Sequence, residues 1–277
     1  MQIGTEPREF LKVMAPAVRA AADIARNLEG SVANRPKSGE ANDIKAALTI
    51  ADTEVQEALL APLLLRFPEV ALRAEEDTPT VAFFAGSSDT SVVIDPIDGT
   101  LRFYLEAAGP YGVMVGLASD NAYDAAIVAL PREGYQLEAV RGGGAHFDDG
   151  RGAPRAARLD SESRTVLVSH DLGAESVSVL RSRGFDVAPA CGGAISVAPL
   201  LPGICAGLRI ATNDPPNVSV RGRVGAMIAA EAGAIVRCET GSPFPGDIDA
   251  PARALLVASS EAVHEALREA LESSSST

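Results

Sequence analysis

SSDTSVVIDPIDGTLRFYLE, residues 87–106, contains the pattern that decides the fold of this chain. The apolar run from Val92 to Ile94 predicts a buried strand, and it leads into Asp95 and Asp98, with a proline between them and a glycine after them. Ligands of open α/β sheets bind at the carboxyl ends of the strands, so both carboxylates are expected in a crevice. Two carboxylates so close together need a counter-charge. Oxygen ligands select a hard divalent cation, Mg²⁺ first.

Other acidic residues bear on the main alternative, an Asp-rich turn whose side chains cap local N–H groups. Asp52 ends the segment ALTIAD, and Glu75 and Glu76 lie in ALRAEEDTP. Each of these residues taken alone is typical of a solvated surface charge. As an ordered series with Asp95 and Asp98, they favour a metal site over a capped turn.

Composition narrows the class of protein. The 277 residues suffice for one large domain or two closely joined ones, and the net charge of −13 disfavours a nucleic-acid partner. Three cysteines without metal-like spacing predict reduced core thiols, and the three histidines are scattered (Cys191, Cys205, Cys238; His146, His170, His264). The opening MQIGTEPREF lacks an apolar stretch, and no long apolar run occurs elsewhere. We therefore expect no signal peptide, no membrane span and a cytoplasmic location.

Periodicity and turn residues predict the order of elements. Helices are expected from Thr5 to about Leu28 and from Thr53 to Phe67, separated by a polar loop at 31–47. Strands are expected in SVVID, YGVMVGLAS, YDAAIVAL, RTVLVSH and ALLVASS, with a hairpin at RGGGAHFDDGR and a helix at 222–232. The fold class is therefore α/β (α+β): an antiparallel half at 1–155, an α/β half at 156–272 and a disordered tail at 273–277.

Several motifs together carry a resemblance to a known family. They are LTIAD, AEE, VIDPIDGTLRFY, RGGGAHFDDG, MIAAEAGAIV and LLVASSEAVHEAL. With them the chain resembles, nearly end to end, the inositol monophosphatase family of Mg²⁺-dependent phosphatases, within the superfamily that includes fructose-1,6-bisphosphatase. The resemblance implies a layered α-β-α-β-α sandwich, a small phosphorylated substrate and a homodimer.

The resemblance also implies a set of metal ligands. Glu75, Asp95 and the backbone carbonyl of Ile97 would hold one Mg²⁺, or Mn²⁺ in its place. Asp95 would bridge to a second ion, held also by Asp98.

Catalytic and substrate-binding roles follow from the same resemblance. Asp52 and Thr100 would orient and deprotonate the attacking water, and Glu75 counts among the catalytic residues as a ligand. The N–H groups of Gly99 and Thr100 would receive the phosphate oxygens beside Asp98. No nucleophile is needed, and no Ser, Cys or His lies in a recognisable triad.

The chain departs from the family at one metal ligand. The family has a Trp-Asp pair eleven and ten residues before the Glu of its E-A-G motif, and counting back from Glu231 gives Val220 and Arg221. A guanidinium about 5 Å from Mg²⁺ would repel it by roughly 6 kcal/mol at an effective dielectric constant of about 20. Arg223 adds another positive charge nearby. Arg221 therefore opposes the second metal and favours the phosphate or another acidic group of the substrate.

Three hypotheses follow from this departure. Arg221 replaces the second cation as a phosphate clamp; or Asp214 becomes a substitute ligand, although an Asp before Pro-Pro is more typical of a turn cap; or the chain binds a phosphorylated ligand with little or no hydrolysis. Because the other motifs are retained, we favour an active phosphatase. Inositol phosphates, sugar phosphates, histidinol phosphate and 3′-phosphonucleotides all remain candidate substrates.

Overall fold

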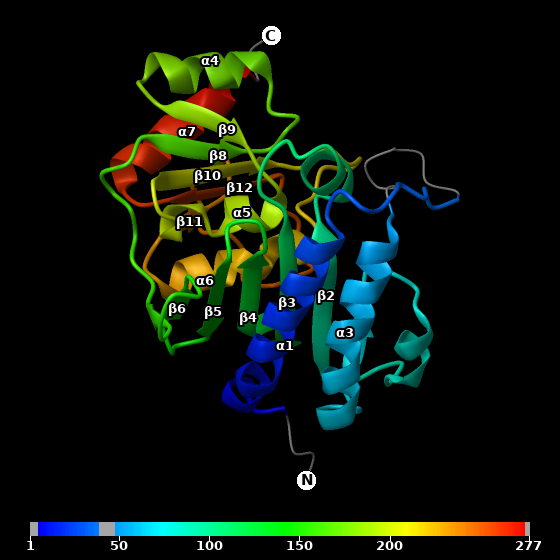
Figure 1. Cartoon of the computed structure of the whole chain (residues 1–277). Helices are drawn as coiled ribbons and strands as arrows, with labels where there is room; N and C mark the ends of the chain where they lie inside the picture. Colours follow the sequence, from blue (N-terminus) through cyan, green and yellow to red (C-terminus); the bar gives the residue numbers. More distant parts are fainter. Residues whose placement is uncertain (1–4, 39–47, 275–277) are drawn as a thin grey trace.

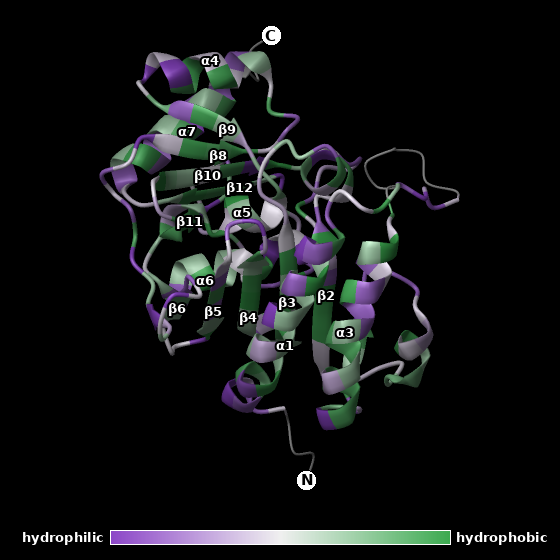
Figure 2. Cartoon of the chain, in the orientation of Figure 1, coloured by the Kyte–Doolittle hydropathy of each residue, from purple (hydrophilic) through white to green (hydrophobic). Residues whose placement is uncertain are grey.

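Two β-sheets alternate with three helical layers in the computed structural model, which describes residues 5–38 and 48–274 (Figure 1). The layers run α1 and α3, first sheet, α5 and α6, second sheet, α4 and α7. The fold is therefore the expected α-β-α-β-α sandwich of mixed α/β class. In Figure 2 the strands are mostly hydrophobic, as expected for sheets that are covered on both faces.

The first sheet is built almost entirely from consecutive antiparallel neighbours. Its order follows the sequence, and only the pair β1–β2 is parallel. The YGVMVGLAS and YDAAIVAL strands and the hairpin at RGGGAHFDDGR all lie in it, as predicted. The strands are β1 (Ala71–Arg73), β2 (Thr90–Asp98), β3 (Gly112–Ser119), β4 (Ala122–Leu130), β5 (Tyr135–Val140), β6 (Ala145–Asp148) and β7 (Arg155–Ala156).

The second sheet is mixed, with the order β11-β12-β10-β8-β9. β8 pairs in parallel with β9 and β10, while β12 pairs antiparallel with β10 and β11. β8 and β12 are the predicted strands RTVLVSH and ALLVASS. The strands are β8 (Thr165–Val168), β9 (Asp186–Pro189), β10 (Ile204–Ile210), β11 (Ile235–Arg237) and β12 (Ala254–Ala258).

The helices cover both faces of each sheet. α1 and α3 pack on the first sheet, α5 and α6 lie between the sheets, and α4 and α7 cover the second sheet. Their bounds are α1 (Pro7–Leu28), α3 (Ile50–Arg66), α4 (Ala174–Ser182), α5 (Gly192–Ser196), α6 (Val224–Glu231) and α7 (Glu261–Ser274). Four short helical turns complete the set: η1 (Pro79–Phe83), η2 (Thr100–Leu105), η3 (Ala198–Leu200) and η4 (Arg221–Arg223).

Several element ends differ from the sequence predictions, among them those of the helix predicted at 222–232, which is α6 at Val224–Glu231. Glu6, not Thr5, caps α1, because its carboxylate accepts the N–H of Glu9. α3 begins at Ile50, three residues earlier than predicted, because Thr49 and Asp52 form a capping box. α7 continues to Ser274, beyond the predicted boundary at 272.

Some predictions fall partly or wholly outside the described residues. Residues 275–277 of the predicted tail at 273–277 lie outside the described residues. So do residues 39–47, which make up most of the predicted polar loop. Nothing in the structure tests whether the halves 1–155 and 156–272 fold separately, although the first sheet ends at Ala156 and the second begins at Thr165. No helix within 5–38 and 48–274 combines the length and apolarity needed to cross a bilayer.

A bulge in β2 explains why the two aspartates of the opening motif act together. Residues three apart in a regular strand face opposite sides of the sheet. Asp95 pairs with Met114 and Asp98 with Gly112, so three steps on β2 match two steps on β3. The extra residue turns both carboxylates to the same side of the sheet.

Candidate functional site

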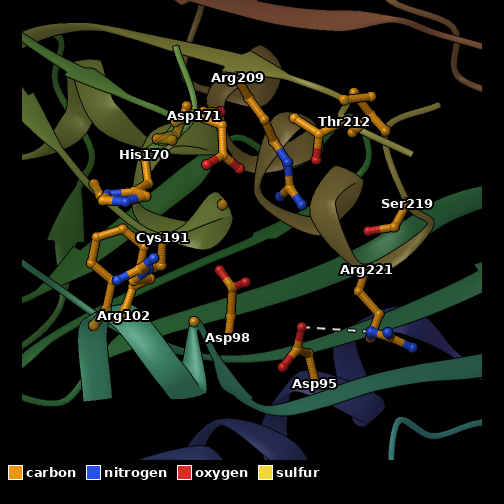
Figure 3. Close-up of a pocket in the computed structure, with 18 of the residues that line it drawn as sticks. Asp95, Asp98, Arg102, His170, Asp171, Cys191, Arg209, Thr212, Ser219 and Arg221 are labelled. Atoms are coloured by element: carbon orange, nitrogen blue, oxygen red, sulfur yellow. Dashed lines mark ion pairs between the residues drawn. The ribbon is translucent and has the colours of Figure 1, made fainter. Parts of the chain in front are cut away.

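A pocket of about 580 Å³ lies where β2 ends, between the two sheets. Its wall contains nearly all of the residues singled out from the sequence: Glu75, Asp95, Ile97, Asp98, Gly99, Thr100 and Arg221. The rest of the wall consists of the segments 169–171, 190–192, 209–213 and 217–219 together with Lys37, Arg102, Phe103 and Ile195. The tertiary fold therefore brings the predicted site residues together, with the divergent region 190–225 opposite them (Figure 3).

Gly99 allows the chain to turn away sharply after Asp98. Its φ of 90° lies in the left-handed region, where side chains are disfavoured. A Cβ at this position would lie 2.6 Å from Cδ2 of Phe103. The glycine thus places Thr100 at the start of η2, directly below the pocket.

Asp95 is the most strongly perturbed acid of the site. It is 5% exposed, and its Oδ1 is buried without a hydrogen-bond partner. Burial, together with the neighbouring Glu75 and Asp98 carboxylates, raises its pKa well above the usual range, although Arg221 opposes the shift. Such a carboxylate is stabilised as an anion by a cation placed close to it.

Asp52 lies behind this group and is held in one orientation. Its Oδ2 accepts hydrogen bonds from the N–H and hydroxyl of Thr49, both at 2.7 Å. Its Oδ1 accepts the Thr100 hydroxyl at 2.9 Å, and that hydroxyl also lies 2.9 Å from the carbonyl oxygen of Ile97. Burial raises the pKa of Asp52 despite these hydrogen bonds. The pair is therefore arranged to take a proton from the pocket.

Arg221 points into the site and lies across two of the predicted metal ligands. Its Nε is 3.6 Å from Oδ2 of Asp95, and its Nη2 is 3.4 Å from Oε1 of Glu75. Burial alone would lower the pKa of this guanidinium, but Glu75, Asp95 and Asp98 raise it on balance. The arginine thus remains charged and supplies part of the counter-charge that the carboxylates need.

The donor set fits one hard divalent cation. Two carboxylates, Glu75 and Asp95, and the carbonyl of Ile97 offer only oxygen atoms, and the buried Oδ1 of Asp95 is free to coordinate. No group of three or more His, Cys, Asp or Glu side chains within 5–38 and 48–274 is arranged to hold a metal ion. A site of two carboxylates and one carbonyl is compatible with that finding, whereas a second all-carboxylate site is not prepared.

Asp98 and Asp214 differ from what a second metal would require. The Oδ2 of Asp98 already accepts the N–H of Gly193 at 2.5 Å. Asp214 is exposed and is not part of the pocket wall. Arg223, by contrast, is buried away from the pocket, where it donates to the carbonyls of Val218 and Asp247, so it adds no charge to the site.

Sequence reasoning missed three cations of the pocket wall, Lys37, Arg102 and Arg209. Lys37 donates to Oε1 of Glu76 at 2.6 Å, so the Glu76 carboxylate is not simply solvated. Arg209 enters from β10, and its position in the otherwise apolar ICAGLRI was the only signal that could have found it. The cysteines are free and buried, in agreement with the expectation of core thiols.

Comparisons with known proteins agree with this fold. The family model described as the inositol monophosphatase family matches residues 6–187. No curated protein matches the chain. Among solved structures, the chain is similar to the IMPase of Thermotoga maritima, with 19% identity, a TM-score of 0.74, and coverage of 95% of this chain and 98% of that one.

Two further solved structures are similar over nearly their whole length. SuhB of Mycobacterium tuberculosis has 20% identity, a TM-score of 0.66 and 97% coverage of both chains. An IMPase/NADP phosphatase complexed with Mg²⁺ and phosphate has 17% identity, a TM-score of 0.71 and 95% coverage of both chains. At these identities the likeness supports the fold and leaves the substrate open.

Proposed function

Because the chain belongs to the inositol monophosphatase family, we propose that it is a Mg²⁺-dependent phosphatase that hydrolyses a small phosphomonoester. Glu75, Asp95 and the carbonyl of Ile97 would hold one metal ion, with Mn²⁺ as an alternative to Mg²⁺. The observation that supports this most directly is the buried, unpartnered Oδ1 of Asp95 beside a second carboxylate. Inositol phosphates and sugar phosphates are the leading substrate classes.

The reaction needs an activated water and a proton acceptor. A bound Mg²⁺ supplies Lewis acidity, which lowers the pKa of water and neutralises the phosphoryl oxygens. The Thr100 hydroxyl accepts the proton of the attacking water while it passes its own proton to Oδ1 of Asp52, 2.9 Å away. The raised pKa of Asp52 makes this carboxylate a better proton acceptor near neutral pH.

Arg221 distinguishes this proposed site from that of the family. By the count back from Glu231, Arg221 would stand where the family has an aspartate, and its Nε lies 3.6 Å from Oδ2 of Asp95. The second cation of the family would then be replaced at least in part by this fixed positive charge. A guanidinium donates a planar fork of N–H groups that fits two phosphoryl oxygens. We therefore propose one firmly held metal, a weakened second site, and a phosphate gripped by Arg221 beside Gly99 and Thr100.

A panel of small phosphomonoesters, assayed with Mg²⁺ or Mn²⁺ varied, tests the proposal. We expect phosphate release from at least one compound and loss of that activity in Asp95→Asn. The metal-free Asp95→Asn protein should remain folded, with an unfolding temperature close to that of the metal-free wild type. Asp214→Asn is the matched control, since it makes the same chemical change at an exposed carboxylate outside the pocket. No turnover of any compound at millimolar metal would refute hydrolysis.

The second candidate function is binding of a phosphorylated ligand with little or no hydrolysis. The contact of Arg221 with both Glu75 and Asp95 favours it, because a guanidinium in that place competes with the metal. Calorimetry that detects ligand binding in a protein without turnover would support this function over the phosphatase.

A further inference from the structure

Arg209 reaches the pocket because side chains alternate between the two faces of β10. Gly207 and Arg209 lie two residues apart and face the same side of the strand. A Cβ on Gly207 would lie 2.0 Å from the carbonyl oxygen of Ile195, which shows that this side faces α5. Arg209 therefore projects into the layer between the sheets, at the end of the strand that borders the pocket.

Two glycines make room for the guanidinium of Arg209. A Cβ on Gly192 would lie 1.6 Å from its Nη1, and a Cβ on Gly222 would lie 2.3 Å from the same atom. Gly222 directly follows Arg221 in the chain, and Gly193, which holds Asp98, directly follows Gly192. The guanidinium is thus fixed between the two segments that border the predicted second metal site.

The charge of Arg209 is not neutralised by the described part of the chain. The lysine and the other two arginines of the pocket wall each form an ion pair. Lys37 pairs with Glu76, Arg102 with Glu106, and Arg221 with Glu75 and Asp95. The side chain of Arg209 forms no ion pair or hydrogen bond with residues 5–38 and 48–274, and its Nη1 is buried without a partner. Asp171 lines the same pocket but forms no ion pair with it.

A guanidinium without an acceptor is unfavourable unless a ligand supplies one. When a hydrogen-bond donor is buried without an acceptor, nothing offsets the free energy of its desolvation, and that free energy is larger for a charged donor. Figure 3 shows the Arg209 guanidinium pointing into the pocket toward Asp98 and Arg221. An oxyanion placed there would offer acceptors to Arg209 and would relieve its repulsion from Arg221.

We propose that Arg209 and Arg221 form an oxyanion site that binds the phosphate group without any metal ion. The site takes a tetrahedral oxyanion, either inorganic phosphate or the phosphoryl group of the substrate. This inference deepens the proposed function, since it assigns to two arginines the phosphate binding that a second cation would otherwise provide. It also holds for a protein that binds its ligand without hydrolysing it.

Calorimetric titration with inorganic phosphate in excess EDTA tests the site directly. We expect saturable binding to the wild-type protein and a loss of affinity of about tenfold or more in Arg209→Gln, as for a hydrogen bond between charged groups. Arg102→Gln is the matched control, because it removes one positive charge from the same pocket at a residue already paired with Glu106. Its phosphate affinity should stay within about twofold of the wild type.

Gly222→Ala removes the site without removing any charge. The new Cβ would displace the tip of a flexible side chain rather than backbone, so the fold is retained while Arg209 is pushed aside. We expect its phosphate affinity to fall as in Arg209→Gln, with an unfolding temperature close to that of the wild type.

Several outcomes would overturn the inference. They are the absence of saturable phosphate binding in EDTA, an affinity unchanged in both Arg209→Gln and Gly222→Ala, and a loss equally large in Arg102→Gln. The inference would also be overturned if Arg209→Gln binds phosphate as tightly as the wild type and raises KM only for substrates that carry a second anionic group. If the protein hydrolyses no substrate but binds phosphate in a way that depends on Arg209, the result would refute the proposed phosphatase and support this site.

Discussion

Arg221→Gln should tighten the binding of Mg²⁺, because it removes the positive charge closest to the predicted metal ligands. The guanidinium lies 3.6 Å from Oδ2 of Asp95 and 3.4 Å from Oε1 of Glu75, measured from Nε and Nη2. A Mg²⁺ bound to these carboxylates at about 2.1 Å would lie roughly 5 Å from the guanidinium. Unit and double charges at that separation repel by about 6 kcal/mol at an effective dielectric constant of about 20.

The measured effect will be smaller than this repulsion. The Arg221 side chain is 32% exposed, so solvent screens it and the side chain can turn away when the metal enters. If about a quarter to a half of the repulsion remains, the Kd for Mg²⁺ falls by roughly 10- to 100-fold in Arg221→Gln. Metal-free Arg221→Gln should unfold at a lower temperature than the wild type, since Asp95 and Glu75 lose their counter-charge.

Titration calorimetry of chelator-treated protein measures the Kd, and thermal unfolding with and without Mg²⁺ measures the second effect. Arg102→Gln serves again as the control, with a Kd for Mg²⁺ within about twofold of the wild type. A Kd for Mg²⁺ that is unchanged or weaker in Arg221→Gln would refute the reasoning, because the guanidinium would then not compete with the metal.

Three further predictions concern the second metal, pH and assembly. Arg221→Asp should raise the stoichiometry of bound Mg²⁺ from one to two, because it replaces a repelling charge with a hard-oxygen ligand; a stoichiometry that stays at one would contradict this. Burial, and then the nearby Arg237, lower the pKa of His264, so the folded state binds this proton less well than the unfolded state. Stability should therefore fall as the pH drops through and below the unfolded value of about 6.5, with a slope of at most about 1.4 kcal/mol per pH unit from this group, and His264→Leu should flatten that part of a pH series of urea unfolding. Finally, we propose a homodimer, which light scattering should report as a mass near twice the 28.6 kDa of one chain, and a mass near that of one chain would contradict it.

Much of the fold could be predicted from local sequence, for physical reasons that act over short distances. The apolar strands of the first sheet follow from runs such as YGVMVGLAS and YDAAIVAL, whose residues are buried on both faces of the sheet. Errors in the predicted elements lie mainly at their ends, where a few atoms decide the outcome, whereas α4, β9 and β10 were not predicted. α3 starts three residues early because the Asp52 side chain accepts the Thr49 N–H, a contact that only the folded backbone reveals.

The site was predicted in its parts but not in its arrangement. Residue type and spacing along the chain indicated Asp95 and Asp98, and the resemblance to the family directed attention to Arg221. The bulge that turns both aspartates to one side requires the register of β2 against β3, and a register is a property of two strands.

Arg209 shows most clearly what the tertiary structure decided. In the sequence it is one arginine in an apolar strand, thirteen residues before Gly222 and far along the chain from the DPIDGT motif at 95–100. Only the packing of β10 against α5, and of α5 against η4, places its guanidinium between two glycines and beside Arg221. Charges interact through space, so local sequence determined which cations this chain carries, and the fold determined which of them forms no ion pair with a carboxylate of residues 5–38 and 48–274.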